Sequence, residues 1–319
     1  MVSIAGSTLL QIVTAVAQEI GPCQPFTTSA TGGAANLVVA ERFADTEAPI
    51  EKYGGFYLYS TVGNMIGEEN RIKRGGFNGG TATFTTARNF TSTPTNPSQF
   101  LLLGTMPILD QDGLVGIRTC VNRAIRKLWI IDKIDIAATS GVYEYDLAAY
   151  PWMAKQRVKR LLDPDPGASG HQVPASQGWQ VVQNADLWTL ELGSGYATGQ
   201  TFSLVVERPA NSRLYLNGAW ADQASPTAGL ALGADACLGE FEHVFQCSLY
   251  ETMKQLALQA GGSRKSYWQQ RTAEQRVVVS AIKLYEVESV EQSLGDGQEE
   301  APSSLGLDAS KGLFSGRWG

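Results

Sequence analysis

Few residues of this chain have the type and spacing that catalysis or metal binding needs. There are only two histidines. His243 lies four residues before Cys247, so both would share one helix face, as zinc ligands sometimes do. A second pair of ligands is missing nearby, and a metalloprotease motif would need a second histidine. His171 falls in a polar loop, where a solvated side chain is expected. We therefore predict no metal, no cofactor and no catalytic residues.

Two further patterns resemble active-site motifs only superficially. The glycine-rich run at residues 75–80 is not followed by a capped helix, which a phosphate-binding loop requires, and is expected to be a flexible arm. Glu191 and Glu207 are the carboxylates that a wall-degrading hydrolase would need, but no pattern marks them as a catalytic pair. An enzyme is therefore not the favoured interpretation.

Basic residues form two clusters, one before residue 128 and one before residue 161. They are Arg118, Arg123, Arg126, Lys127, Lys155, Arg157, Lys159 and Arg160. Such clusters can dock onto an acidic protein or line a channel through which DNA passes without sequence-specific contacts. The alternative is a solvated helix face and an edge strand. The net charge of −6 argues against a dedicated nucleic-acid binder.

Composition indicates a folded chain with extensive protein contacts. Hydrophobic residues make up 43% of the 319 residues, which is enough for a buried core. Only 18% are charged and 34 residues are glycine, so much of the surface is expected to meet other protein. The four cysteines lack CxxC spacing, and we expect free thiols. No signal peptide or membrane-spanning segment is predicted.

Hydrophobic periodicity places helices at both ends and in the middle of the chain. Apolar residues recur at helical spacing over 9–20, 112–128 and 235–260, and a further helix is expected over 263–285. A short helix is also predicted over 34–43.

The regions between these helices have β character. Residues 129–136 alternate like a strand, and Gly141 is expected to turn the chain into a partner strand over 142–147. Short strands with turn signals follow over 151–220, which is typical of an antiparallel sandwich or barrel.

These elements predict an α+β protein. We expect helices with β-hairpin arms over 1–150, where 44–110 is an extended arm without a compact core of its own. An antiparallel β-insert resembling a sandwich or barrel is expected over 151–225. A helical hairpin over 226–290 would pack on the N-terminal and central helices to form one helical domain. Residues 291–319 would form an extended docking tail.

Four stretches of the chain share a pattern with one known family. They are Ser7–Gly21 with Pro25 and Ala35-Asn36-Leu37 after it, Val121–Trp129 with the hairpin that follows, Tyr150-Pro151-Trp152, and the C-terminal hairpin with Tyr250, Tyr267 and Trp268. Together they resemble the head-to-tail adaptor proteins of tailed bacteriophages, over about half of the chain. Residues 44–110 depart from a minimal adaptor and indicate an added arm or a fibre-docking element.

The resemblance implies a structural protein of the virion, made in the host cytoplasm and placed at the head–tail junction. Such proteins form a dodecameric ring below the portal, the ring through which DNA enters and leaves the capsid. The expected partners are further copies of this chain, the portal protein, a tail nozzle or tube protein, a tail fibre, and DNA passing through the lumen. No membrane is involved. The tail would dock on the portal through Leu305, Leu307, Leu313, Phe314, Arg317 and Trp318.

Two alternatives stay open. The chain is also compatible with another virion part, either a tail nozzle or tube protein or a collar protein that holds fibres. A carbohydrate-binding β-module is a function of a different class, in which Trp179, Trp188 and Trp220 would stack against sugar rings. The same tryptophans also suit the core of a β-sandwich.

Overall fold

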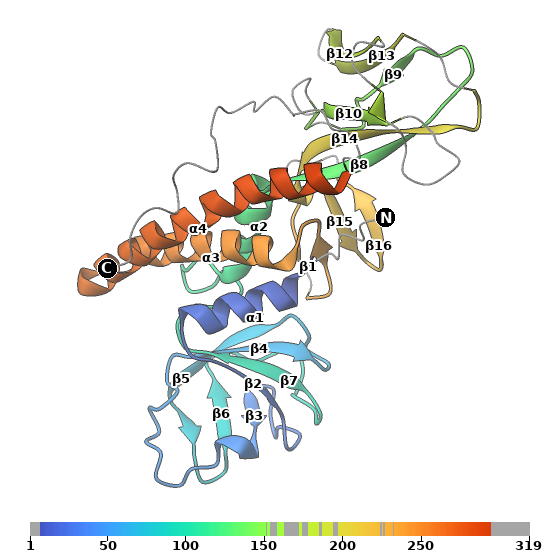
Figure 1. Cartoon of the computed structure of the whole chain (residues 1–319). Helices are drawn as coiled ribbons and strands as arrows, with labels where there is room; N and C mark the ends of the chain where they lie inside the picture. The colour runs from blue at the N-terminus through green and yellow to red at the C-terminus, as the bar shows by residue number, and fades with distance from the viewer. Residues whose placement is uncertain are drawn as a thin grey trace.

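The computed structural model shows a mixed α+β protein in three parts that follow one another along the molecule (Figure 1). A six-stranded sheet lies at one end, the helices lie in the middle, and a β-insert lies at the other end. The predicted α+β class is confirmed. The structure describes residues 7–150, 152–153, 158–162, 172–173, 178–184, 187–193, 197–223, 225, 227–231 and 233–294.

The six-stranded sheet has the spatial order β2-β7-β4-β5-β6-β3, and its neighbours are antiparallel. Its strands are β2 (Cys23–Thr27), β3 (Leu37–Val39), β4 (Tyr57–Val62), β5 (Glu69–Asn78), β6 (Thr83–Thr86) and β7 (Gln99–Leu103). Ser29 and Ala30 directly follow β2 and lie beside β3, at the other edge of the sheet. Ala30 pairs with Val39, and the Ser29 N–H donates to the Val39 carbonyl at 3.0 Å. The two outer strands therefore meet, and the sheet closes on itself.

Aromatic rings fill the inside of this closed sheet. Phe26, Phe43, Phe84 and Phe100 are buried there, and the rings of Phe43 and Phe84 meet edge to face with centroids 5.2 Å apart. The expectation of extended arms without a compact core over 44–110 is therefore wrong. Closing six strands around these rings gives the segment its own core, so it needs no neighbouring chain to bury its apolar surface.

The helix α1 (Leu9–Ile20) covers the outer face of β4 and β7. The Thr8 side chain caps its start by accepting from the Gln11 N–H, and the Gln11 side chain accepts from the Thr8 N–H. Successive residues of a strand point to opposite faces. Leu58 therefore enters the aromatic core while Tyr59 is buried beneath α1.

Three further helices share this second core with α1. They are α2 (Ile117–Lys127), α3 (Phe241–Gln259) and α4 (Gly262–Leu294). The helix α3 contacts α1, α2 and α4, so it is the central element of the group. The expected C-terminal helical hairpin is present as α3 and α4, with the turn at Ala260 and Gly261.

A small sheet closes the helical part on one side. Its order is β1-β17-β15-β16, from β1 (Ser7–Thr8), β17 (Ala236–Cys237), β15 (Arg213–Leu216) and β16 (Ala219–Asp222). Asn217 and Gly218 connect β15 to β16 with φ of 53° and 87°. Two positive φ values in succession are what a tight type I′ hairpin needs, and Asn-Gly supplies them.

The β-insert is joined to the helices by two long strands, β8 (Trp129–Ala137) and β14 (Thr201–Pro209). They pair along their whole length, with Trp129 opposite Pro209 and Ala137 opposite Thr201. β10 (Val158–Leu162) and β11 (Gln172–Val173) extend this sheet, and β12 (Trp179–Asn184), β13 (Leu187–Leu192) and β9 (Glu144–Asp146) form a second one. Apolar residues of both sheets gather in one core.

The hairpin predicted between 129–136 and 142–147 is wrong. The strand β8 pairs with the distant β14, and β9 pairs with β13. Six residues separate β8 from β9, which is longer than a tight hairpin turn. The distant strand β14 offers nine residues in register, so it forms more hydrogen bonds with β8 than a local partner of three residues.

Two predicted helices also differ from the structure. Residues 34–43 contain the strand β3 and a short 3-10 turn at Glu41–Phe43, because Val38 and Phe43 are buried in the aromatic core. The central helix begins at Ile117 and not at residue 112. Asp112 and Gly113 have φ of 52° and 75°, a left-handed conformation that a right-handed helix cannot contain.

Glu69 joins the six-stranded sheet to the loop that leads into α2. Its carboxylate accepts hydrogen bonds from the N–H groups of Ile108 at 2.8 Å and Leu109 at 2.7 Å. The side chain is buried, and burial raises the pKa of Glu69 to about 7 although both donors act in the opposite direction. Folding therefore favours the protonated form of this carboxyl between about pH 4.5 and 7.

We expect Glu69 to make the protein less stable as the pH rises through this window. Between about pH 4.5 and 7 the folded state binds a proton that the unfolded state has released. The free energy of unfolding therefore falls by up to about 3 kcal/mol as the pH rises through this range, and this contribution is constant at higher pH. Glu69→Gln cannot ionise and should remove this slope. Urea unfolding at pH 5, 6, 7 and 8 measures it, with the exposed Glu19→Gln as control. Equal slopes in Glu69→Gln and the wild type would refute the assignment.

Candidate functional site

The first basic cluster lies on α2 and contacts the protein itself. Arg123 donates to the Gln255 side chain of α3 at 3.0 Å, and Lys127 pairs with Glu251 of α3 at 2.6 Å. Glu251 is buried, so Lys127 compensates a charge that has left water. These two residues fix α2 against α3. Any role of theirs toward DNA or an acidic partner stays a prediction.

The other two cations of α2 hold the loop that precedes α3. Arg118 donates to the carbonyl of Ala231 at 3.3 Å and Arg126 to that of Thr227 at 2.5 Å. Between them, Asn122 exchanges two hydrogen bonds with the backbone of Leu230. The three side chains are spaced by four residues, so they form one row along the helix. This row satisfies backbone groups that have no partner in regular secondary structure.

The remaining predicted contact residues are only partly described. Lys159 pairs with Glu207 across β10 and β14 at 2.9 Å, and Arg160 is half-buried on β10. Lys155 and Arg157 lie outside the described residues. So do the six tail residues predicted to dock on the portal, Leu305, Leu307, Leu313, Phe314, Arg317 and Trp318.

The residues nominated for other functions do not come together. Trp179 and Trp188 pack half-buried on the core of the insert, whereas Trp220 stands on β16 in a different sheet, next to Tyr215. Trp179 and Trp188 share the core-facing side of the β12–β13 pair and Trp220 is in another sheet, so the three rings do not form one exposed platform for a sugar chain. Glu191 accepts a hydrogen bond from the Gln180 side chain at 2.7 Å, and Glu207 is paired as above.

The histidine and cysteine pattern forms no metal centre in the described part of the chain. His243 is buried on α3, with Glu240 at 4.0 Å. Cys237 is completely buried, and burial raises the pKa of its thiol to about 12. Such a thiol stays protonated at neutral pH and is a poor nucleophile and metal ligand.

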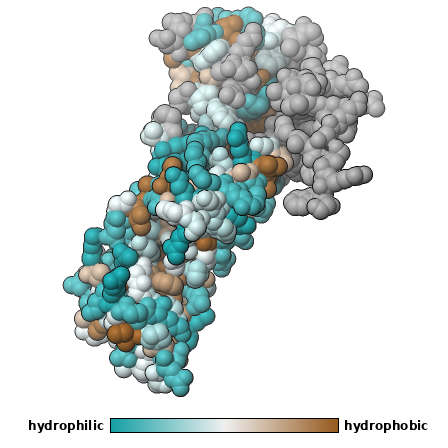
Figure 2. All heavy atoms as spheres, turned by 90° about the vertical axis from the view of Figure 1, so that its left-hand side faces the viewer, coloured by the Kyte–Doolittle hydropathy of each residue, from teal (hydrophilic) through white to brown (hydrophobic). Residues whose placement is uncertain are grey.

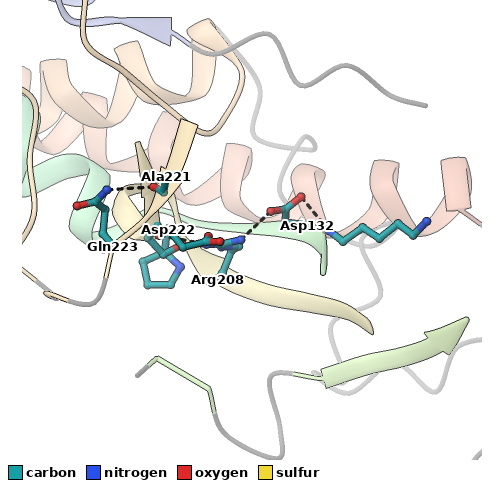
Figure 3. Close-up of polar contacts among 8 residues, drawn as sticks. Asp132, Arg208, Ala221, Asp222 and Gln223 are labelled. Atoms are coloured by element: carbon teal, nitrogen blue, oxygen red, sulfur yellow. Dashed lines mark hydrogen bonds and ion pairs between the residues drawn. The ribbon is translucent and has the colours of Figure 1, made fainter. Parts of the chain in front are cut away.

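A buried arginine stands where the β-insert leaves the helical part, and the sequence pattern did not single it out. Arg208 of β14 is only 2% exposed and lies between Asp132 of β8 and Asp222 of β16 (Figure 3). Its guanidinium donates to Asp132 at 3.0 Å and to Asp222 at 2.5 Å. It also donates to the Ser212 hydroxyl and carbonyl at 2.6 and 3.1 Å. The ring of Trp152 lies 5.0 Å from it.

This arrangement fixes the direction of the insert relative to the helices. Three strands and the turn after β14 meet at one planar guanidinium, whose donors have defined directions. A buried charge is tolerated only when it is paired and hydrogen-bonded, so the contacts are kept together. The signal in the sequence was an arginine at the end of an apolar β-run, but its two aspartates are 76 and 14 residues away in the chain.

Comparison with protein-family models, with curated proteins and with solved structures finds no match for this chain. In the described ranges, no helix has both the length and the apolar character needed to cross a membrane.

Most residues of the outer helix α4 are exposed between Gly262 and Ile282. Its inner face follows a heptad-like spacing of four, three, four and three residues, at Trp268, Thr272, Gln275, Val279 and Ile282. This narrow stripe faces α3, and α4 also contacts β8.

A second stripe with the same spacing runs beside the buried one. It contains Tyr267, Arg271, Glu274 and Val278, and the exposed fractions of Tyr267 and Val278 are 54% and 41%. Val277 on the opposite side is 63% exposed. Apolar side chains are therefore exposed on two sides of α4, on the flank beside the buried stripe and on the face opposite that stripe.

We expect the substitution Arg208→Met to destabilise the protein by about 3–5 kcal/mol. It removes the cation that compensates Asp132 and the donors that hold Ser212. Arg208→Lys keeps the charge but not the planar donors and should cost less. Urea unfolding measures the loss, with the exposed pair Lys133–Asp135 as control through Lys133→Met. A loss below about 1 kcal/mol, as for surface pairs, would contradict the assigned role.

Proposed function

We propose that this protein is a structural component of a virus particle, the subunit of a head-to-tail adaptor ring that joins the portal to the tail. The observation that carries the proposal is α4, which buries one narrow stripe within the chain and leaves apolar residues exposed on two flanks. A subunit with neighbours on both sides needs two such flanks, because a closed ring uses different surfaces for its two contacts.

The location of the resembling stretches supports the same assignment. The first forms α1, and the second forms the end of α2 and the start of β8. The C-terminal hairpin is formed by α3 and α4. The buried residues of these helices belong to one core, so three of the resembling segments fold together. Tyr150 and Trp152 pack on the core of the insert instead, and the hairpin that was part of the resemblance after Trp129 is not formed. We interpret this core as the helical domain of an adaptor, with the insert as its tail-facing β-domain.

The six-stranded sheet includes, from β4 to β7, most of residues 44–110, the segment in which the chain departs from a minimal adaptor. It has its own core and is joined to the helices through α1. We propose that it contacts a fibre or a collar element from the rim of the ring. A tail nozzle or tube subunit would also form a ring, and the two assignments differ in whether residues 291–319 contact the portal or the tail.

We expect copies of the purified chain to assemble into a closed ring when they are mixed with a portal ring. Native mass spectrometry measures the mass of the assembly for the chain alone and after mixing with portal. A chain that stays monomeric in both conditions would contradict the adaptor assignment, and a ring that forms but ignores the portal would favour the nozzle or collar assignment.

Deletion of residues 295–319 should abolish portal binding and leave the described fold intact. The cut follows the last residue of α4, so the helix is retained. Circular dichroism checks the fold, and sedimentation with portal rings checks the docking. The matched full-length variant Phe314→Ala with Trp318→Ala should also bind weakly, because aromatic anchors carry much of such a contact. Normal binding by both variants would refute the docking tail.

A further inference from the structure

The charges of α4 are arranged opposite to what a helix on its own prefers. Its first half carries Arg264, Lys265, Arg271 and Arg276 against the single acidic residue Glu274. The sequence of its last turns and of the six residues that follow carries only acidic charges after Lys283, at Glu286, Glu288, Glu291, Asp296, Glu299 and Glu300. A helix is stabilised by carboxylates near its start and by cations near its end. The arrangement in α4 therefore opposes the helix dipole at both ends.

The two halves of α4 cannot neutralise each other within one copy of the helix. The helix is continuous from Gly262 to Leu294. Arg271 and Glu286 are fifteen residues apart, which corresponds to about 22 Å along the axis. At that distance the charges are screened by salt.

The basic half of α4 is also open to a partner. Arg264, Lys265 and Arg276 are exposed, and none of the four cations forms an ion pair with a carboxylate of the described residues. The Nε atom of Arg271 is shielded from water and has no hydrogen-bond partner there. Arg271 lies between Tyr267 and Val278 on the exposed flank, so charge and apolar contact area are combined on one side.

The surface around this end of the helices favours recognition by charge. Figure 2 views the molecule from the side of the turn between α3 and α4, and hydrophobic residues appear there as separate spots among hydrophilic ones. A surface of this kind does not offer one large apolar patch. Specific docking on it then depends on complementary charges that select the partner and its orientation.

We propose that the acidic segment 286–300 of a second copy of this chain docks on the basic half of α4, residues 264–278. The contact is head to tail: each copy offers its basic half to one neighbour and its acidic segment to the other. Such a contact continues from copy to copy until the ring closes. The inference rests on the proposed function for the ring geometry, but the contact between copies does not depend on the portal.

Charge reversal on either side should disrupt self-association. One variant carries Arg271→Glu and Arg276→Glu, which changes the basic half to a net charge of −1. The other carries Glu286→Lys, Glu288→Lys, Glu299→Lys and Glu300→Lys, which changes the acidic segment from −6 to +2. Each alone places like charges against each other and should weaken assembly at least about tenfold. Because Arg276 is exposed, Arg276→Glu alone should also weaken assembly if the double variant folds poorly. The control Lys73→Glu with Arg74→Glu makes the same change in net charge as the first variant at exposed positions of β5, in the six-stranded sheet.

Mixing the two reversed variants is the decisive experiment. The acidic segment of the first variant meets the unchanged basic half of the second, and the new basic segment of the second meets the new acidic half of the first. The mixture should therefore regain the assembly that each variant has lost. Mass photometry over a range of concentrations, at about 0.05 and 0.5 M salt, measures this without portal and then with it.

The outcomes separate this inference from the proposed function. Loss of assembly in each variant with recovery in the mixture supports the contact, even if the portal is never bound. Reversed variants that assemble like the wild type and the control overturn it, and so does a loss that mixing does not restore. A wild-type chain that remains monomeric with and without portal overturns it as well.

Discussion

The antiparallel pairing of β8 with β14 holds the β-insert onto the rest of the molecule. Nine residues on each strand are in register, and the ribbon begins in the core of the helices and ends in the core of the insert. Ile130 belongs to the first core and Ile134 to the second. A two-stranded ribbon alone would twist and bend, so its direction must be fixed at its base. Arg208 does this, because its guanidinium ties both strands of the ribbon to β16.

The other junctions between the parts of the molecule also contain a polar side chain that is hydrogen-bonded to the backbone. Glu69 binds two N–H groups of the loop before α2, and Asn122 binds the loop before α3. Apolar contacts between the parts supply most of the attraction but little orientation. Directed hydrogen bonds exclude the wrong orientations, because a buried polar group without a partner would be costly. The relative positions of the three parts are therefore specified by a few polar residues.

The sequence predicts what is local in this fold and misses what is distant. The amphipathic patterns of α1 and of most of α3 depend on neighbouring residues, and so do the turn signals that predicted short strands over 151–220. These predictions are confirmed, except that residues 236–237, expected at the start of the third helix, form β17. The partner of β8 was missed because it lies more than sixty residues away, and the closed sheet was missed because its edges meet only in space. Arg208 and Glu69 were missed for the same reason. Their burial and partners arise from packing, and nothing in the local pattern distinguishes them from solvated charges.

The helix α4 has both a local and a distant feature. The spacing of its buried stripe can be read from the sequence, whereas only the structure shows which of its faces α3 leaves uncovered. A charge distribution that opposes the helix dipole reduces the stability of the isolated chain by a few tenths of a kcal/mol for each charge. The same charges gain free energy when an oppositely charged surface covers them in an assembly. In the proposed ring, this unfavourable feature of the single subunit would therefore favour assembly, because the charges that destabilise α4 on its own would be compensated where two copies meet.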